Sequence, residues 1–406
     1  MKGLGILWLV VFISLMGFGI TTIPFPLVTE QMGASDFWKT FGGPGVFSVF
    51  QLIATPIWGR YSDSLGRKPI LLFSLAGSVL AYIWLAYAND LVSLLVARAF
   101  GGIMSGNLAA AYAYAADVTD VKNRAKGLGI IGSAFGVGFA LGPPLGGFLG
   151  TDAAGAASLH WPALASAALS LLALLATWLL LKESLAPENR KPLRAAPGSA
   201  ATASGGSPFA QVTANAVLMG LMIAALVVAI GGASMQSIYQ FWSRDLFQFS
   251  LREVGFQFMW FAICSIHGQV ILIGPLVRRF GEKTVALIAT ACAAVGLLMF
   301  AAAMQPWFVW LTIAVFGVAN GLFLPSVSSL VSFEADPRNR GAIMGAFNSA
   351  SSAGRIVGPA VSGPLYFSLG HAAPYLFAAL LTVLGGVLLL RAKPRPAAAA
   401  PGAPPA

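Results

Sequence analysis

The chain contains 406 residues, of which 57% are hydrophobic and only 9% are charged. Soluble globular domains carry about 25% charged residues, so this composition excludes a soluble globule and indicates a chain embedded in a lipid bilayer. The net charge of +10 would suggest a nucleic-acid partner in a soluble protein. Here the basic residues stand between apolar runs, and membrane topology accounts for them without nucleic acid.

Apolar runs of membrane length recur along the whole chain. A transmembrane helix needs about 20 apolar residues, and the twelve qualifying runs predict an all-α membrane protein made of two six-helix halves. The first run is too long for a signal peptide and lacks a cleavage site, so we interpret it as the first span. The expected spans are residues 5–28, 42–60, 69–88, 91–114, 127–150, 161–181, 212–238, 252–276, 284–303, 306–330, 341–366 and 372–391.

Lysine and arginine residues fall almost entirely on one side of this topology. With the N-terminus inside, nineteen of them lie in segments that face the cytoplasm, and only Lys39, Arg244 and Arg252 lie outside. Cytoplasmic loops of membrane proteins are enriched in these residues. The sequence therefore predicts a multi-pass protein of the cell (cytoplasmic or inner) membrane with both termini in the cytoplasm.

The outer end of the first span carries a candidate for the substrate cavity and a candidate acid. Thr21 precedes prolines at positions 24 and 26, which remove backbone donors and are expected to kink the end of the helix. Glu30 follows at the outer interface. It is either a solvated loop acid or an acid that takes up protons at the mouth of the cavity.

The loop between the second and third spans, from Gly59 to Pro69, is the most specific short motif. Gly59 and Gly66 permit a tight turn and a close approach of helices. Asp63 and Arg67 place opposite charges one helical turn apart at the membrane edge. Two interpretations remain open from these residues alone, a solvated charged loop and a conformational latch.

Ionisable residues also lie inside predicted spans. Arg98 lies in the fourth span, His267 near the middle of the eighth, and Arg355 near or past the midplane in the eleventh. A charged side chain within the membrane costs at least ~2.5 kcal/mol on insertion scales, so it needs a partner or a water-filled cavity. Histidine, with a pKa of about 6.5, suits reversible protonation, and a neutral packing histidine is the alternative.

The fifth span carries a glycine and proline pattern that returns 216 positions later in the eleventh span. Small residues at such spacing let membrane helices pack closely. A duplication with matched flanks, residues 120–124 and 336–340, is typical of secondary transporters whose substrate site lies between the halves. The first copy consists of Gly129, Gly138, Gly142, Pro143, Gly146 and Gly147, and the second of Gly345, Gly354, Gly358, Pro359, Ser362 and Gly363.

Polar and aromatic residues within the spans are candidates for the wall of a substrate cavity. Helix packing is the alternative for each of them, and an interfacial aromatic belt is a further alternative in the seventh span. The candidates are Asn107 and Tyr112 in the fourth span, Tyr239 and Trp242 in the seventh, Phe316, Asn320 and Phe323 in the tenth, and Arg355 in the eleventh.

The 59–69 loop and the 129–147 motif together resemble the major facilitator superfamily, and within it the drug:proton antiporter branch and the tetracycline efflux proteins. The resemblance runs over nearly all twelve spans and is weakest in the third span and around 183–210. It implies two pseudo-symmetric six-helix bundles that work by alternating access. Spans one, four, seven and ten would line the central cavity.

The resemblance also implies roles for individual residues. Asp63 would face the start of the eleventh span near Gly341 and Arg340, where the positive end of the helix dipole favours a carboxylate. Arg67 would pair with Asp117. The implied latch is Gly59, Asp63, Gly66, Arg67, Asp117 and Arg340, and the proton-coupling candidates are Arg98, which the resemblance links to proton transfer, His267 and Glu30.

The sequence departs from the tetracycline exporters at two positions. Those exporters have aspartates in the first and third spans, and the corresponding residues here are Ser14 and Ala81. With Arg98 and Arg355 embedded and no acid in the middle of a span, we expect a cavity of net positive charge. Such a cavity favours anionic or neutral amphipathic substrates over cations.

These observations predict a secondary transporter that exports hydrophobic small molecules or drugs in exchange for protons, by alternating access. The alternatives are a carrier of a metabolite, sugar or lipid-linked anion, and a membrane-embedded enzyme or receptor. Paired intramembrane carboxylates, a Ser-His-Asp set and a His-Glu-x-x-His motif are missing, so we expect no enzyme. Cys264 and Cys292 lack ligand-like spacing, and we expect neither metal nor cofactor.

The expected organisation has four parts. Residues 1–182 form an N-terminal bundle and residues 211–392 a C-terminal bundle. Residues 183–210 form a cytoplasmic linker rich in proline, alanine, glycine and serine, and residues 393–406 form a disordered tail. The expected partners are a small-molecule substrate, protons and the lipid bilayer, and we expect a monomer.

Overall fold

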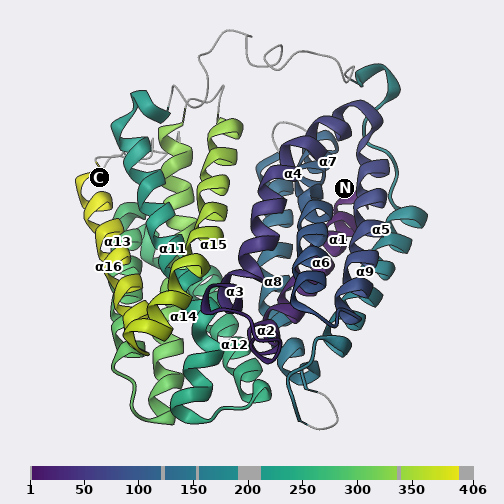
Figure 1. The fold of residues 1–406 in the computed structure, drawn as a ribbon. Coiled ribbons are helices and arrows are strands. Elements are labelled where there is room, and N and C mark those ends of the chain that lie inside the picture. The colour runs from purple at the N-terminus through teal and green to yellow at the C-terminus, as the bar shows by residue number, and fades with distance from the viewer. Residues whose placement is uncertain (1, 120–123, 152–154, 191–211, 336–339, 393–406) are drawn as a thin grey trace, which may run out of the picture.

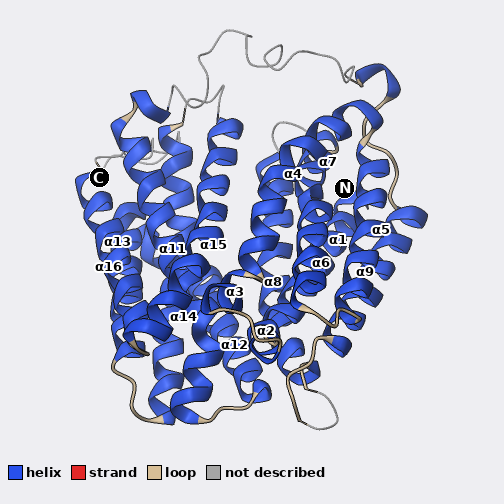
Figure 2. Cartoon of the chain, viewed as in Figure 1, coloured by secondary structure: helices blue, strands red, loops and turns tan. Residues whose placement is uncertain are grey.

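The computed structural model describes residues 2–119, 124–151, 155–190, 212–335 and 340–392. Within these ranges the secondary structure is helical, apart from one isolated antiparallel bridge between Thr151 and Ala157 (Figure 2). The helices gather into two bundles that stand side by side (Figure 1). Three predicted site residues, Asn107, Gly129 and Arg340, have side-chain surroundings outside the described part of the chain.

The N-terminal bundle is built from the first half of the chain. Its first span is bent, because α1 ends before Pro24 and α2 restarts the helix there. The elements are α1 (Lys2–Thr22), α2 (Phe25–Gln31), α3 (Asp36–Phe41), α4 (Pro44–Leu65), α5 (Arg67–Ala86), α6 (Leu91–Met104), the 3₁₀ turn η1 (Ser105–Asn107), α7 (Leu108–Asp117), α8 (Arg124–Leu149), α9 (His160–Leu180) and the 3₁₀ turn η2 (Pro187–Asn189).

The C-terminal bundle repeats this order of spans. Its second span contains a single π-helical turn that begins at His267, and such turns are frequent at functional sites. The elements are α11 (Ala216–Phe247), α12 (Leu251–Ile266), the π-turn η3 (His267–Leu272), α13 (Ile273–Ala301), α14 (Pro306–Glu334), α15 (Arg340–Leu369) and α16 (Ala373–Arg391).

Eight helical segments of the described chain are long and apolar enough to cross a membrane. The longest, Leu251–Ala301, holds two spans because the chain turns at Gly281, where φ is 78°. α4, α8 and α15, with 22, 26 and 30 residues, complete the set. Each of these three is at least about 33 Å long at 1.5 Å per residue, which spans a bilayer core of about 30 Å. The predicted fold of twelve transmembrane helices is confirmed.

Equivalent helices pack in equivalent ways in the two bundles. α1 packs on α8 as α11 packs on α15, and α5 packs on α9 as α13 packs on α16. The turns before α5 and within α13 also correspond, since Gly66 and Gly281 both have positive φ, 111° and 78°. In each bundle the lysine two residues later, Lys68 or Lys283, donates to carbonyls at the end of the bundle's last helix. The duplication seen in the sequence is thus a duplication of structure.

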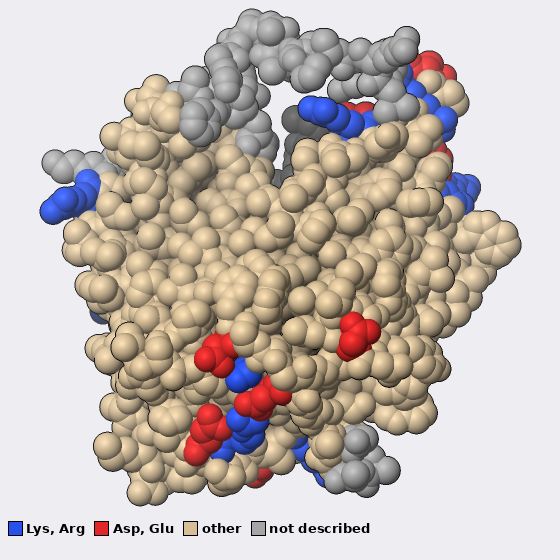
Figure 3. Space-filling model, viewed as in Figure 1, with Lys and Arg blue, Asp and Glu red and all other residues tan. Residues whose placement is uncertain are grey.

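The surface of the molecule fits a bilayer. In Figure 3 the charged side chains gather toward the two ends of the molecule, and the belt between them is almost entirely uncharged. Large apolar side chains are exposed along this belt, such as Leu172 and Leu179 on α9 and Leu380 on α16. The interior holds several apolar clusters, one of which joins Ile23 of the N-terminal half to residues of the C-terminal half.

The two halves contact each other at one end. We call this the gate end, where α2, α3 and the N-terminus of α12 lie, and we call the opposite end, where α9 ends and α11 begins, the linker end. α8 packs on α12 and α3 packs on α15 at the gate end. At the linker end the tops of α4 and α15 stand apart, and the surface is notched between the halves (Figures 1 and 3).

Candidate functional site

A salt bridge joins the two halves at the gate end. Arg244 in the last turn of α11 places Nη1 2.5 Å from Oε2 of Glu30 near the end of α2. The Nε of Arg244 also lies 2.9 Å from Oδ1 of Asp245. The side chains of Arg244 and Glu30 remain 38% and 30% exposed, so this pair adds only about 0–1 kcal/mol of stability.

Further polar contacts extend this gate toward α15 and α16. The hydroxyl of Tyr366 donates to Oδ2 of Asp245 at 2.9 Å, and Nδ1 of His371 lies 2.7 Å from the same hydroxyl. On α3, the hydroxyl of Thr40 donates to the carbonyl of Pro359 at 2.8 Å. Of these contacts, the one between Thr40 and Pro359 joins the two halves.

The glycines of the duplicated motif bring helix backbones together within each half. A Cβ at Gly138 would lie 2.6 Å from the carbonyl of Phe12 on α1, and one at Gly142 would lie 2.7 Å from the carbonyl of Met16. In the second copy, a Cβ at Gly358 would lie 2.7 Å from the backbone nitrogen of Ser234 on α11. Any side chain at these positions would push the helices apart.

The last glycine of each copy faces the opposite half instead. A Cβ at Gly147 would meet Gly255 on α12 at 2.7 Å. A Cβ at Gly363 would meet the carbonyl of Asp36 and the side chain of Thr40 on α3. The motif therefore packs each half internally and also shuts the gate end between the halves.

The predicted latch residues form a cluster within the N-terminal half at the linker end. Arg67 is 7% exposed and donates to Oδ1 of Asp63 at 2.5 Å, to Oδ2 of Asp117 at 3.1 Å and to the hydroxyl of Ser62 at 2.7 Å. Gly59 and Gly66 flank it at the end of α4, as expected. The expected partner across the halves, Arg340 with the start of α15, lies outside the described side chains.

Glu183 completes this cluster and was not among the residues singled out from the sequence. Its carboxylate accepts from the backbone N–H groups of Arg67 at 2.9 Å and Lys68 at 3.1 Å, which caps the N-terminus of α5. A Cβ at Gly66 would lie 2.5 Å from this carboxylate. The start of the predicted linker is therefore anchored on the N-terminal half. An acid two residues after Leu181, the last apolar residue of the span, was the available signal.

The two embedded arginines have no acidic partner among the described ion pairs. Arg98 is 2% exposed, with its guanidinium 4.8 Å from the ring of Phe25 and 5.8 Å from that of Phe18. Its Nε and Nη2 have no hydrogen-bond partner in the described structure. Arg355 donates from Nη2 to the hydroxyl of Ser352 at 3.0 Å. Both are positive charges that a negatively charged group could approach once the helices move.

The other ionisable candidates lie at different levels. Glu30 is paired at the gate end, as described above, and is not a free loop acid in this conformation. His267 is exposed at the first residue of the π-turn. The structure does not bring Glu30, His267 and Arg98 together into one cluster, since they lie on α2, η3 and α6.

Several cavity candidates are packing residues in this conformation. Thr21 is fully buried and donates to carbonyls of its own helix. Trp242 is 1% exposed among Tyr375, Phe300 and Phe247, and Phe323 is buried in a separate cluster near the linker end. On α14, Phe316 and Phe323 are buried and Asn320 is exposed. Tyr112 packs on the core of the N-terminal half.

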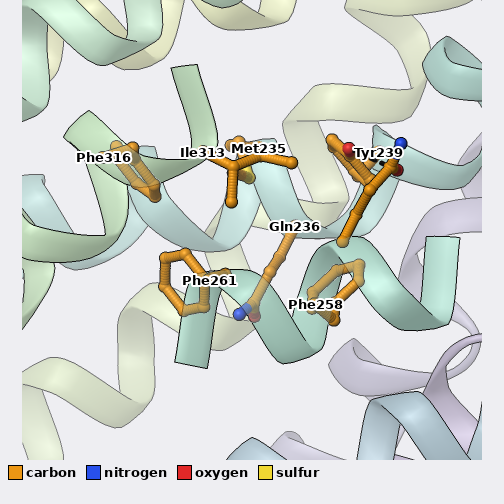
Figure 4. Close-up of a pocket in the computed structure, with 8 residues that line it drawn as sticks. Met235, Gln236, Tyr239, Phe258, Phe261, Ile313 and Phe316 are labelled. Atoms are coloured by element: carbon orange, nitrogen blue, oxygen red, sulfur yellow. Dashed lines mark hydrogen bonds between the residues drawn. The ribbon is translucent and has the colours of Figure 1, made fainter. Parts of the chain in front are cut away.

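A pocket occurs where α11, α12 and α14 meet in the C-terminal half (Figure 4). Two cavity candidates, Tyr239 and Phe316, line it. Its other residues, which the sequence did not single out as site residues, include two polar amides in an apolar setting. α11 contributes Met235, Gln236 and Tyr239, α12 contributes Gln257, Phe258 and Phe261, and α14 contributes Ile313 and Phe316.

Comparisons with known proteins agree with this architecture. The family model described as Major Facilitator Superfamily matches residues 7–251 and 221–406. The tetracycline resistance protein, class C, of Escherichia coli is 30% identical over 354 residues, which cover 86% of each chain. The major facilitator superfamily domain-containing protein 10 of Bos taurus is 31% identical over 367 residues, covering 85% of this chain and 77% of the relative.

Two solved structures share the fold. The human organic anion transporter MFSD10 (TETRAN) matches with a TM-score of 0.70 and 24% identity, covering 96% of this chain and 99% of that one. A bacterial homologue of the human lysosomal transporter Spinster, inward-facing and unoccupied, matches with a TM-score of 0.72 and 16% identity, covering 96% and 94%. The duplicated bundles, the glycine motif and these matches show that the chain is a multi-pass membrane transporter of the major facilitator superfamily.

Proposed function

We propose that this protein exports hydrophobic small molecules across the cytoplasmic membrane in exchange for protons, by alternating access. The observation that carries the proposal is the asymmetry between the two ends. The contacts described between the halves lie at the gate end, whereas α4 and α15 stand apart at the linker end. The basic residues of the sequence assign the linker end to the cytoplasm. Substrate then enters from the cytoplasm and leaves through the gate.

The relatives support the direction of transport. The tetracycline resistance proteins of classes C and H match 86% and 95% of this chain, and their names refer to drug resistance. In an exporter of this kind the proton gradient supplies the work, and each elementary charge that crosses 100 mV contributes about 2.3 kcal/mol. We propose Arg98, His267 and Glu30 as the residues among which the proton-coupling group lies.

The Asp63, Arg67, Asp117 and Glu183 cluster supports a latch at the cytoplasmic end. In the conformation described, its charges are satisfied within one half. When the linker end closes, Asp63 is available to meet the N-terminus of α15. We propose that Asp63 alternates between Arg67 and the N-terminus of α15 in each transport cycle. We also propose that the protein is a monomer whose two bundles are residues 1–182 and 211–392.

A second candidate function is transport of organic anions. Two observations favour it. The two embedded arginines have no acidic partner among the described ion pairs, and the acidic residues of the described helices lie away from the middle of the spans. In the described helices every Asp and Glu stands near a helix end or, for Glu282, beside the turn at Gly281. Ser14 and Ala81 occupy the two places where an intramembrane acid was expected from the resemblance. The human organic anion transporter MFSD10, whose fold this chain shares, is consistent with this candidate.

One experiment separates the candidates. Bacteria lacking their own exporters would be loaded with fluorescent cationic, neutral and anionic compounds, with and without this chain and with and without a proton uncoupler. Lower accumulation that the uncoupler reverses supports proton-driven export, and the responding charge class decides between the two candidates. If the chain changes the accumulation of no compound, both proposals fail, and a dedicated metabolite or lipid carrier takes their place.

A further inference from the structure

The pocket between α11, α12 and α14 contains a buried donor that lacks an acceptor. Gln257 is 1% exposed, and its Oε1 accepts a hydrogen bond from the Tyr239 hydroxyl at 2.7 Å. The Nε2 of Gln257 has no partner among the described residues. Since buried polar groups are almost always hydrogen-bonded, this donor marks a place where an acceptor is expected.

The remaining walls of the pocket are aromatic. The rings of Phe261 and Phe316 stack with centroids 5.9 Å apart, and Phe258 meets Tyr239 edge to face at 5.4 Å. Figure 4 shows the side chain of Gln236 extending between Phe258 and Phe261. Counting its open mouth, the free space is about 290 Å³. The cavity proper measures about 20 Å³, which holds about one water molecule, so a larger group enters it only when Gln236 swings aside.

The pocket lies close to the gate. Tyr239 precedes Arg244 by five residues on α11, a rise of about 7.5 Å along the helix. Gln257 lies six residues into α12, at the same end. A group that fills the pocket therefore adjoins the helix whose last turn holds the salt bridge between the halves.

We propose that this pocket receives an aromatic ring bearing a hydrogen-bond acceptor, as the part of the transported substrate nearest the gate. The ring stacks among Phe258, Phe261 and Phe316 after Gln236 swings aside, and the acceptor pairs with Nε2 of Gln257. The proposal rests on the proposed function, because the occupant is a transported substrate. It adds a binding preference that depends neither on the direction of transport nor on protons.

The test uses benzophenone, a neutral aromatic ketone, on the purified full-length chain in detergent. On irradiation its carbonyl oxygen abstracts a hydrogen from a nearby C–H group, and the two radicals join, so that the ketone becomes a tertiary alcohol bonded to the protein. We expect labelling at Met235 and its neighbours in the pocket, mapped by mass spectrometry. Diphenylmethane has the same two rings without the acceptor, and we expect it to compete about threefold to tenfold less well than unlabelled benzophenone.

Four variants distinguish the effect of the Gln257 donor from the effect of the pocket's shape. Gln257→Leu removes the donor, so labelling should fall and the advantage of the ketone over diphenylmethane should vanish. Gln305→Leu, at an exposed residue before α14, is the matched control and should label as the wild type. Gln236→Ala should increase labelling severalfold, because it vacates the space between Phe258 and Phe261. If Gln257→Leu does not fold, Tyr239→Phe releases the amide and should reduce the ketone's advantage.

Labelling scattered outside the pocket, or equal competition by diphenylmethane in the wild type, would overturn the proposal and leave the pocket to a water molecule. Its failure is distinguishable from failure of the proposed function. Uncoupler-sensitive efflux without pocket labelling would remove only the subsite. Pocket labelling without efflux of any compound would retain the subsite and remove proton-driven export. A parallel arm with 4-benzoylbenzoate, the anionic analogue, reports the charge class that the site accepts.

Discussion

Arg244 Nη1 lies 2.5 Å from Glu30 Oε2 and so ties the last turn of α11 to the end of α2, across the interface between the halves. The pair closes a loop of 214 residues of chain. Because it is partly exposed, it contributes about 0–1 kcal/mol. A contribution of that size changes a two-state equilibrium by up to about fivefold, which is enough to alter transport without altering folding.

Glu30→Gln should therefore shift the protein toward conformations with an open gate. We expect a cysteine reagent that does not cross the membrane to react up to about fivefold faster with a cysteine placed at Thr40 in this background. The reason is that Thr40 contacts Pro359 only while the gate is closed.

Glu253→Gln is the matched control for this gate prediction. Glu253 also lies at the gate end, but it forms a capping box with Ser250, a role that glutamine fills equally well. An unchanged labelling rate in Glu30→Gln would contradict the assignment of the salt bridge to the gate.

The glycine motif predicts that alanine substitutions at two positions of α15 have different effects on stability. Gly358→Ala should destabilise the protein by about 1–3 kcal/mol, because its Cβ would lie 2.7 Å from the nitrogen of Ser234 and 2.8 Å from the carbonyl of Ile230. Gly345→Ala should be neutral or stabilise by up to about 1 kcal/mol, since nothing lies within 4 Å of its Cβ. Thermal unfolding of the two variants in detergent measures the difference. Equal melting temperatures would show that α15 and α11 do not need the close approach.

The charged cluster at the linker end predicts a variant that folds but transports poorly. Asp63→Asn should leave insertion and melting temperature nearly unchanged, because Asp63 is 38% exposed and surface ion pairs contribute about 0–1 kcal/mol. Turnover should fall, since the latch is needed in one conformation only. Asp90→Asn is the control, because asparagine caps a helix as well as the aspartate at the N-cap of α6 does. Wild-type transport by Asp63→Asn would remove the latch from the mechanism.

We predict that removing the Arg98 side chain impairs the coupling of proton movement to substrate transport. We expect Arg98→Ala to abolish proton movement on addition of substrate, a loss of about 100-fold or more if the arginine takes part in proton transfer. Substrate-induced proton fluxes in proteoliposomes give the measurement, and Arg279→Gln, at an exposed arginine, serves as the control. Proton fluxes that persist in Arg98→Ala would exclude Arg98 from proton coupling.

Local features of the sequence predicted the fold and the positions of its motifs. The apolar runs located the spans, and the repeated spacing located the glycine contacts between α8 and α1 and between α15 and α11. The loop at Gly66 was recognisable from its own residues, Gly59 to Pro69. All of these depend on residues close together in the chain.

The contacts between distant residues could not be predicted in the same way. Glu30 and Arg244 read as two separate charges near the outer surface, and only the docking of the halves brings them together. Trp242 and Phe323 illustrate another limit, because an aromatic residue in an apolar span looks the same whether it faces a cavity or a core. Gln257 was overlooked because a single amide in a span carries no pattern of its own. Its significance arises from the neighbours that leave its Nε2 without an acceptor.

The two glycines that face the opposite half, Gly147 and Gly363, have a mechanical consequence. At both glycines the contact is backbone against backbone or against a short side chain. Dispersion contacts of this kind are lost within about an ångström of movement. The contacts at Gly147 and Gly363 should therefore both be lost within a short movement. A half-open gate that leaks ions should then be too short-lived to discharge the membrane.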